Sequence, residues 1–224
     1  MTKEVIIFLG PPGSGKGTQA ELLKEYGYTS FSTGHLLRKE VEKGSTIGKQ
    51  IQGLIDKGSL VSDEIILKLC SNEMKRIPEN KIIIDGFPRT LNQAELASKY
   101  LIKYPVIDLK KVFIFNLDEM VLINRIRNRV SCGKCGATYN LLTKRPMISD
   151  VCDVCGDKLI SRVDDSEIDS IIKRNKIYNS NICDITYFYA KNNLTFFIDS
   201  VKDLKSINQE IKSILNITNN NSEV

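Results

Sequence analysis

Residues 5–18 constrain the fold more than any other part of the chain. They read VIIFLGPPGSGKGT, an apolar run followed by a loop rich in glycine that carries Lys16, and a helical pattern begins at Gln19. Glycines let successive backbone N–H groups surround a phosphate, the helix N-terminus adds a positive dipole end, and a lysine neutralises the outer oxygens. A plain Gly-Pro turn explains the glycines but not this order of elements. The segment therefore predicts a phosphate-binding loop between a strand and a helix.

Five short runs rich in β-branched and aromatic residues alternate with segments of helical periodicity. The runs are residues 5–9, 28–31, 82–85, 112–117 and 195–199. This alternation indicates an α/β fold, a five-stranded parallel sheet of the P-loop NTPase type with helices on both faces. Ligands of such sheets bind at the carboxyl ends of the strands.

Two segments fit the sheet poorly and are predicted to be insertions. Residues 33–61 are helical in pattern and interrupted by glycines, and residues 129–161 contain four of the six cysteines. The core is then expected to comprise residues 1–32, 62–128 and 162–215. The polar residues 216–224 are expected to form a disordered tail.

Charge and hydropathy limit the classes of molecule that the chain is expected to bind. The net charge of +5 is spread without a concentrated basic run, so a small anion is a better partner than nucleic acid. The apolar stretch at the N-terminus ends at Gly10, far short of the roughly 20 residues of a membrane span, and it lacks the form of a secretory signal. We therefore expect a cytoplasmic monomer with no membrane or nucleic-acid partner.

Four cysteines follow the pattern C-x2-C, x16, C-x2-C. They are Cys132, Cys135, Cys152 and Cys155. Two such pairs supply four thiolates in tetrahedral reach, which is typical of a closed structural zinc site that braces the protein rather than reacting. Disulfides or an iron–sulfur cluster are the alternatives. Cys70 and Cys183 stand alone on helical patterns and are expected to be free core residues.

Several motifs together carry a family resemblance. In the loop, Gly17 stands where the strict G-x-x-x-x-G-K-[ST] pattern has a hydroxyl, and GPPGSGKGTQA resembles the phosphate loop of adenylate kinases and related nucleoside monophosphate kinases. STGHLLR at residues 32–38 and DGFPRTLNQ at residues 85–93 resemble the family's monophosphate site. The cysteine cluster lies between Arg129 and Arg162, which resembles the zinc-bearing lid of the family's long form.

The resemblance implies magnesium-dependent phosphoryl transfer from ATP to AMP, giving two ADP. The implied catalytic residues are Lys16, Arg125, Arg129, Arg162 and Arg174. The implied ATP-binding residues are Gly10, Gly13, Ser14, Gly15, Lys16, Gly17, Thr18, Arg125, Arg129 and Lys202. The implied AMP-binding residues are Thr33, Arg38, Gly58, Val61, Gly86, Arg89, Gln93, Arg162 and Arg174. Planar guanidinium groups hold phosphates in bidentate fashion, and Asp85 is expected to hold magnesium through water.

Some positions depart from the family's pattern. His35 stands where aspartate is usual, and we assign it no catalytic role. Asn140 stands where histidine is common, and Ser200 where glycine is usual near the donor adenine, so use of GTP alongside ATP stays open. The usual count from Arg162 reaches Lys173, whereas counting back from residues 187–189 reaches Arg174. We assign the second transition-state cation to Arg174, which implies one extra residue between positions 166 and 172.

Other functions remain as alternatives. A pyrimidine or guanine monophosphate kinase would share the phosphate loop, although the long lid and Gln93, whose carboxamide both donates and accepts, favour AMP. A regulatory nucleotide switch would need no acceptor arginines. A zinc-ribbon binding module would need no phosphate loop.

Overall fold

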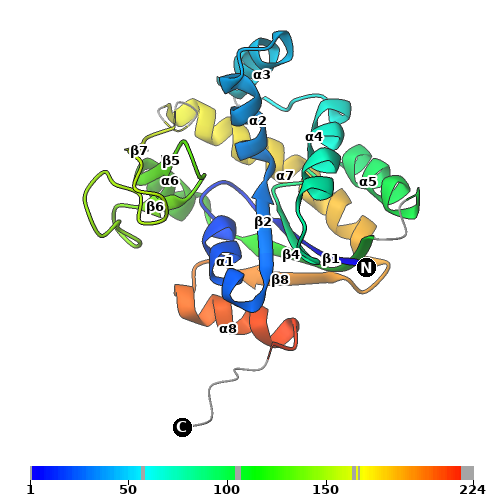
Figure 1. Ribbon diagram of the computed structural model, residues 1–224. Coiled ribbons are helices and arrows are strands. Elements are labelled where there is room, and N and C mark those ends of the chain that lie inside the picture. The colour runs from blue at the N-terminus through cyan, green and yellow to red at the C-terminus, as the bar shows by residue number, and fades with distance from the viewer. Residues whose placement is uncertain (1, 57–58, 104–106, 163–164, 166, 218–224) are drawn as a thin grey trace.

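A five-stranded parallel sheet in the order β2-β3-β1-β4-β8 forms the centre of the computed structural model (Figure 1). The strands are β1 (Lys3–Leu9), β2 (Tyr28–Ser32), β3 (Lys81–Asp85), β4 (Ile107–Asn116) and β8 (Thr195–Asp199). The structure describes residues 2–56, 59–103, 107–162, 165 and 167–217. The predicted fold class and all five predicted strands are confirmed. Strand β4 begins earlier than predicted because its ladder with β1 starts at Ile107, opposite Lys3.

Helices cover both faces of the sheet. On one face lie α1 (Lys16–Leu22), the 3-10 turn η1 (Lys24–Tyr26) and α8 (Leu204–Ile214), and on the other lie α4 (Asp63–Arg76), α5 (Leu91–Lys103) and α7 (Ile168–Ala190). Helices α2 (Thr33–Glu42) and α3 (Thr46–Asp56) project beyond the end of β2 (Figure 1). Helix α6 (Glu119–Arg127) leads into a second, smaller sheet.

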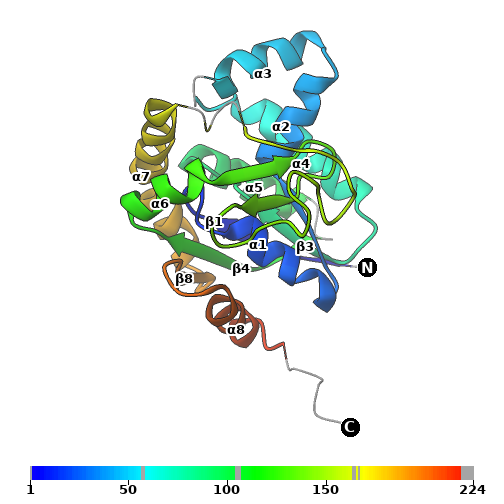
Figure 2. The same ribbon diagram turned by 90° about the vertical axis from the view of Figure 1, so that its left-hand side faces the viewer.

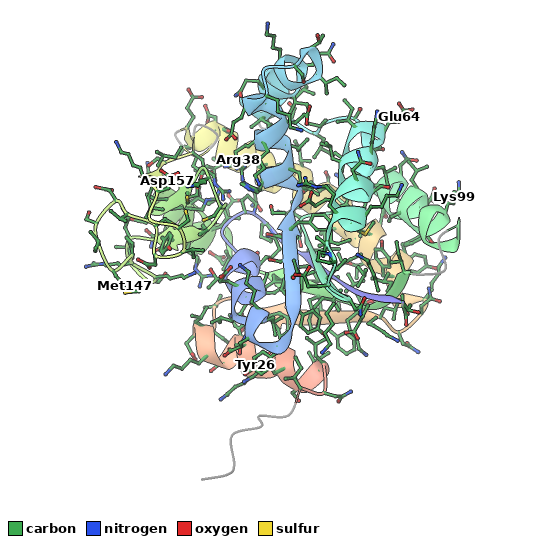
Figure 3. All side chains as sticks on the ribbon, viewed as in Figure 1. Tyr26, Arg38, Glu64, Lys99, Met147 and Asp157 are labelled. Carbon is green, nitrogen blue, oxygen red and sulfur yellow. The ribbon has the colours of Figure 1, made fainter. Side chains whose placement is uncertain are left out.

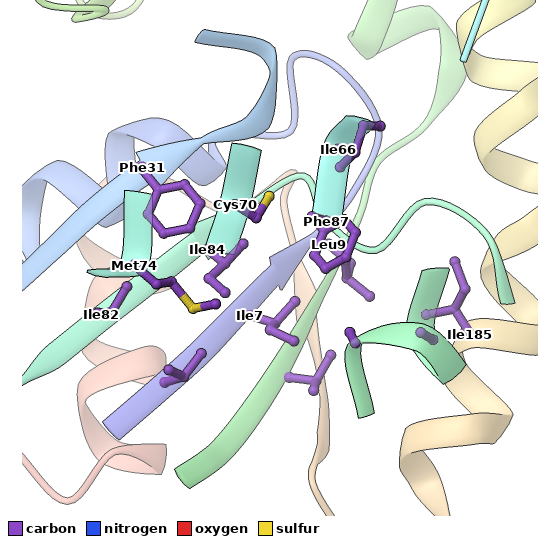
Figure 4. Packing of buried hydrophobic residues seen from close by; sticks show 14 of the residues in the cluster. Ile7, Leu9, Phe31, Ile66, Cys70, Met74, Ile82, Ile84, Phe87 and Ile185 are labelled. Atoms are coloured by element: carbon purple, nitrogen blue, oxygen red, sulfur yellow. The ribbon is translucent and has the colours of Figure 1, made fainter. Parts of the chain in front are cut away.

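The core explains why the strand sequences are apolar without interruption. Side chains alternate along β1, so that Val5, Ile7 and Leu9 join the cluster beneath α4, α5 and α7, while Ile6 and Phe8 join the cluster beneath α1 and α8. Figure 4 shows Ile7 and Leu9 packed with Cys70, Met74 and Phe87. A strand buried on both faces needs apolar residues at every position, and this fixes β1 at the centre of the molecule.

The cysteine-rich segment forms a small antiparallel sheet in the order β6-β5-β7. Its strands are β5 (Arg129–Cys132), β6 (Thr138–Asn140) and β7 (Leu159–Ile160). Figure 1 shows this sheet to one side of the main sheet, next to α6, and in Figure 2 the same side of the molecule faces the viewer. We call residues 129–161, which contain these three strands, the lid segment.

The two lone cysteines differ in environment. Cys70 on α4 is buried, as predicted, whereas Cys183 on α7 is exposed, so the prediction that Cys183 belongs to the core was wrong. None of the helices in the described part of the chain combines the length and apolar composition that a membrane crossing requires.

Candidate active site

The phosphate-binding loop connects β1 to α1, as predicted. Gly13 and Gly15 adopt φ angles of 80° and 87°, and Gly15 caps the N-terminus of α1. Gly10 is needed for a different reason: a Cβ there would lie 2.7 Å from Ser14 Oγ and 2.8 Å from Phe115 Cβ. Because both contacts are shorter than packing allows, any larger residue would push the loop away from the end of the sheet.

Lys16 turns back into this loop. Its Nζ donates hydrogen bonds to Gly10 O and Pro11 O, both at 2.9 Å, and to Ser14 Oγ at 3.1 Å. Burial lowers the pKa of Lys16 to about 8, while the nearby Asp85 carboxylate acts in the opposite direction. The ammonium group therefore sits where an anion bound by the loop would stabilise its charge. The other loop residues named from the sequence lie beside it, with Ser14 buried, Thr18 half-buried and Gly17 exposed.

Asp85 ends β3 next to the same loop. A Cβ on Gly17 would lie 3.8 Å from Asp85 Oδ2, so the carboxylate faces the start of α1. Carboxylate oxygens are ligands that Mg²⁺ accepts in phosphate sites, often through water. The residues present at this edge thus fit a magnesium ion.

A second group of predicted residues gathers at the carboxyl ends of β2 and β3. Thr33 is buried and its hydroxyl donates to Gly86 O at 3.0 Å, and Arg89 Nε donates to the same oxygen at 2.9 Å. Arg38 lies on α2 close to Gly34. Figure 3 labels Arg38 on the side of α2 turned toward the lid segment. Val61 is buried, and Gly58 lies outside the described residues.

Gln93 is fully buried and its carboxamide is held by the protein. Its Nε2 donates to Asp63 Oδ1 at 2.7 Å, and its Oε1 accepts from Arg89 N at 2.7 Å. Asn92 also donates to Asp63. Sequence reasoning missed Asp63, which fixes Gln93 in place. These two bonds leave one N–H donor and one acceptor lone pair of the Gln93 amide unused.

Two of the arginines expected to close on phosphates, Arg129 and Arg174, share one acid. Arg129 donates to Asp165 through two nitrogens, at 2.7 and 2.6 Å, and Arg174 Nη2 donates to the same carboxylate at 2.8 Å. Burial by itself raises the pKa of Asp165, but the charges of Arg129 and Arg174 outweigh burial and hold the pKa below its usual value. The Arg-Val-Asp-Asp run that starts at Arg162 was the available signal for Asp165, which sequence reasoning gave no role.

The two remaining arginines approach from the lid segment and α6. Arg162 Nε donates to Ser131 Oγ at 3.0 Å and its Nη2 to Thr138 Oγ1 at 3.3 Å, so it is tied to the lid sheet. Arg125 lies on α6, and burial lowers its pKa. Lys202 instead lies on the surface, where its Nζ donates to Glu210 at 2.9 Å.

Replacing Asp165 with asparagine should destabilise the protein by about 3 kcal/mol, because two nearly buried guanidinium groups lose their counter-ion. The wild type should have its full excess in free energy of unfolding over the variant at pH values above the ordinary Asp pKa of about 4. This difference should vanish as the pH falls through the lowered pKa of Asp165. Denaturant unfolding of both proteins across this pH range measures it. The matched control is Asp108→Asn, which removes the exposed ion pair with Lys110 and should cost less than about 1 kcal/mol. Equal costs for both variants would contradict the assigned role.

The four predicted metal ligands converge in the lid segment. All four Sγ atoms lie within 4.8 Å of one another, and the pairs Cys132–Cys155 and Cys135–Cys152 are each 3.5 Å apart. Thiolates at about 2.3 Å from a tetrahedral zinc lie about 3.8 Å apart, so the cluster can hold such an ion. The Tyr139 hydroxyl accepts from Asp153 N at 2.8 Å and lies 3.6 Å from Cys152 Sγ, which braces the second cysteine pair.

Two departures from the family pattern have structural consequences. Asn140 donates to Arg125 O at 3.0 Å and accepts from the backbone N–H groups of Leu142 and Thr143, so it ties a lid turn to the end of α6. Ser200 is fully buried behind β8, and its hydroxyl has no hydrogen-bond partner. Asn140 therefore adds hydrogen bonds between the lid and α6, whereas Ser200 leaves a buried hydroxyl without a partner.

Comparison with known proteins agrees with this geometry. The profile of the family described as "Adenylate kinase" matches residues 8–194, from β1 to the segment before β8. The chain belongs to the adenylate kinase family. An adenylate kinase is a phosphotransferase, and the chain is therefore an enzyme with a nucleotide-binding site.

Individual adenylate kinases match over nearly their whole length. The protein named adenylate kinase from Petrotoga mobilis is 38% identical over 94% of this chain and 96% of its own length. The adenylate kinase of Thermosipho melanesiensis is 39% identical, covering 95% of this chain and 98% of its own, and that of Archaeoglobus fulgidus is 38% identical, covering 94% and 97%.

Proposed function

We propose that this enzyme catalyses reversible, magnesium-dependent transfer of the terminal phosphoryl group of ATP to AMP, giving two ADP. The observation that carries the proposal is the meeting of two anion sites at one edge of the sheet. One is the loop around Lys16, and the other is the pair of arginines, Arg38 and Arg89, beyond β2 and β3. A hydrolase or a switch needs only the first of these sites.

The proposed roles follow from position. Lys16 and the loop amides hold the donor phosphates, and Arg38 and Arg89 hold the phosphate of AMP. Thr33, Gly86 and Gln93 face the acceptor base, while Gly58 to Val61 form its wall. Phosphoryl transfer depends on positioning and neutralisation of charge, so no nucleophilic side chain is required.

The remaining arginines neutralise the group in transfer. Arg125, Arg129, Arg162 and Arg174 fill this role, and Asp165 orients two of them in advance. A guanidinium has five N–H donors, so Arg129 and Arg174 keep donors for phosphate oxygens while bound to Asp165. Magnesium, held near Asp85, supplies charge neutralisation on the phosphate oxygens.

We propose the same domain bounds that the sequence predicts. The core comprises residues 1–32, 62–128 and 162–215, residues 33–61 bind AMP, and residues 129–161 form a lid braced by zinc. A cytoplasmic setting suits it, because thiolate ligands and the free Cys70 and Cys183 require reducing conditions. A single chain carries every proposed group, so the enzyme is proposed to act as a monomer, without nucleic acid or membrane.

Replacing Cys132 with serine should remove one zinc per chain and lower the thermal midpoint of the lid segment before it lowers the chemical step, because metal binding contributes directly to folding of the small sheet. Elemental analysis and calorimetry measure both effects. The matched control is Cys183→Ser, which changes an exposed cysteine outside the cluster and should leave the metal content unchanged. Iron, or no metal, in wild-type protein purified without chelator would refute the zinc assignment.

Acceptor selectivity tests the proposed function. The enzyme is mixed with magnesium ATP and, in turn, AMP, CMP, UMP or GMP, and nucleotide products are separated by chromatography. Of the four monophosphates, only AMP should give rapid formation of ADP. Faster turnover with CMP, UMP or GMP would replace the proposal with a kinase of another monophosphate, and nucleotide hydrolysis without any acceptor would indicate a switch. Repeating the AMP reaction with GTP as donor settles the selectivity at Ser200.

A further inference from the structure

His35 is the point at which the AMP-binding side meets the lid segment. It is the second residue after Thr33 at the start of α2, and its side chain is half-buried. A Cβ built on Gly136 of the lid segment would lie 3.1 Å from both Cγ and Nδ1 of the imidazole and 3.2 Å from Cε1. The His35 ring therefore lies against the backbone of Gly136, although the two residues are far apart in the sequence.

Gly136 is suited to this contact for two independent reasons. Its φ angle of 78° is one that side chains rarely adopt, and a Cβ at this position would press on the imidazole ring. Its N–H donates to Cys132 O at 3.0 Å, which closes the first cysteine pair. The surface that His35 contacts is thus fixed to the cysteine cluster and moves with it.

The surroundings of the ring are cationic. Burial lowers the pKa of His35 to about 4, and the charges of Lys39, Arg38 and Arg162 act in the same direction. Arg38 and Lys39 belong to α2, whereas Arg162 follows β7 and is tied to the lid sheet. A neutral imidazole fits this place by packing alone. An aspartate at this position would instead be attracted to the same three cations.

We propose that His35 is a positioning residue onto which the lid docks through Gly136, and that it sets how readily the lid closes against the AMP-binding residues when both nucleotides are bound. The inference rests on the proposed function, because it presupposes that AMP is the acceptor held beside α2. It gives His35 no part in the chemistry. The contact replaces charge attraction with packing, so closure is held less firmly than it would be with an acid at this position.

Steady-state kinetics of two substitutions test the inference. His35→Ala removes the docking surface and should raise KM for AMP about five- to tenfold, with kcat changed less than about twofold. His35→Asp adds attraction to the three cations and should lower both KM and kcat, because opening to release product becomes slower. Opposite shifts of KM are not expected of a residue that only supports α2. The matched control is Lys43→Ala at the end of the same helix, which should leave both constants unchanged.

Hydrogen exchange of the lid peptide at residues 131–140 gives a second readout. With ATP and AMP bound, this peptide should be less protected in His35→Ala and more protected in His35→Asp than in the wild type. A pH series from 7.5 to 5.5 should raise KM for AMP more in the wild type than in His35→Asn. An imidazole that is free of the lid takes up a proton near its ordinary pKa of about 6.5, whereas docking beside Arg38, Lys39 and Arg162 lowers the pKa to about 4. Docking must therefore release that proton, and it becomes less favourable as the pH falls below about 6.5.

The outcomes separate the two proposals. Normal ADP formation with unchanged KM and lid protection in both variants would overturn the docking role and leave the proposed function intact. Absence of ADP formation in the wild type would overturn the proposed function itself. KM rising equally in both variants would assign His35 a purely structural role and would also overturn the inference.

Discussion

Replacing Lys16 with alanine should reduce kcat by about 10²- to 10³-fold, the range found when one group that stabilises developing charge is removed. Lys16 is the cation enclosed by the loop, where its Nζ contacts two carbonyl oxygens and Ser14 Oγ. Burial already disfavours its charge, so a bound phosphate gains an unusually strong partner at this point. No other side chain of the loop can replace that charge.

The fold should survive this change, because the lysine contacts the loop and packs little against the two clusters of the core. Circular dichroism and the thermal midpoint check this. Lys24→Ala is the matched control, since Lys24 lies just beyond α1 in an exposed ion pair with Glu21 and should retain wild-type kcat. Near-normal turnover of folded Lys16→Ala would remove the loop from the mechanism.

Arg174→Ala should lower kcat on the order of 10²-fold or more, judged from arginines that stabilise phosphoryl-transfer transition states, and Lys173→Ala should cost far less. Neighbouring residues on a helix point about 100° apart, so Lys173 and Arg174 cannot both face the phosphates. Arg174 donates to Asp165 together with Arg129, whereas the exposed Lys173 donates to Ser59 Oγ at 3.0 Å.

Arg174→Lys separates charge from geometry. A lysine keeps the charge but lacks the planar fork, so this variant should recover only a small part of the lost rate. If Lys173→Ala proves more damaging than Arg174→Ala, the extra residue lies elsewhere in the segment before α7 and the assignment of Arg174 is wrong. Stopped-flow measurement of ADP formation distinguishes the chemical step from product release.

Features that depend on residues close together in the sequence were predictable. The apolar run of β1, the glycines around Lys16 and the C-x2-C pairs each follow from spacing along the chain, and the structure has all three. Helix α7 begins at Ile168, within the segment where the register required an extra residue. These features depend on neighbours in sequence, which is why composition and periodicity suffice.

Features that depend on distant segments were not predictable. Asp165 joins β5 and α7 through Arg129 and Arg174, and Asp63 reaches Gln93 across two helices. Their roles arise only when the chain folds, because an acid beside a helix start reads as a capping residue in sequence. The prediction that Cys183 is a core residue was wrong for a related reason. The helical pattern around it does not indicate which side of α7 packs on the sheet.

Phosphorus NMR of the purified enzyme with magnesium ATP and AMP tests the central claim most directly. The account predicts that the ATP and AMP signals fall together while ADP signals grow, that no inorganic phosphate appears, and that the enzyme given ADP alone reaches the same mixture. Release of inorganic phosphate with AMP unchanged would contradict the account.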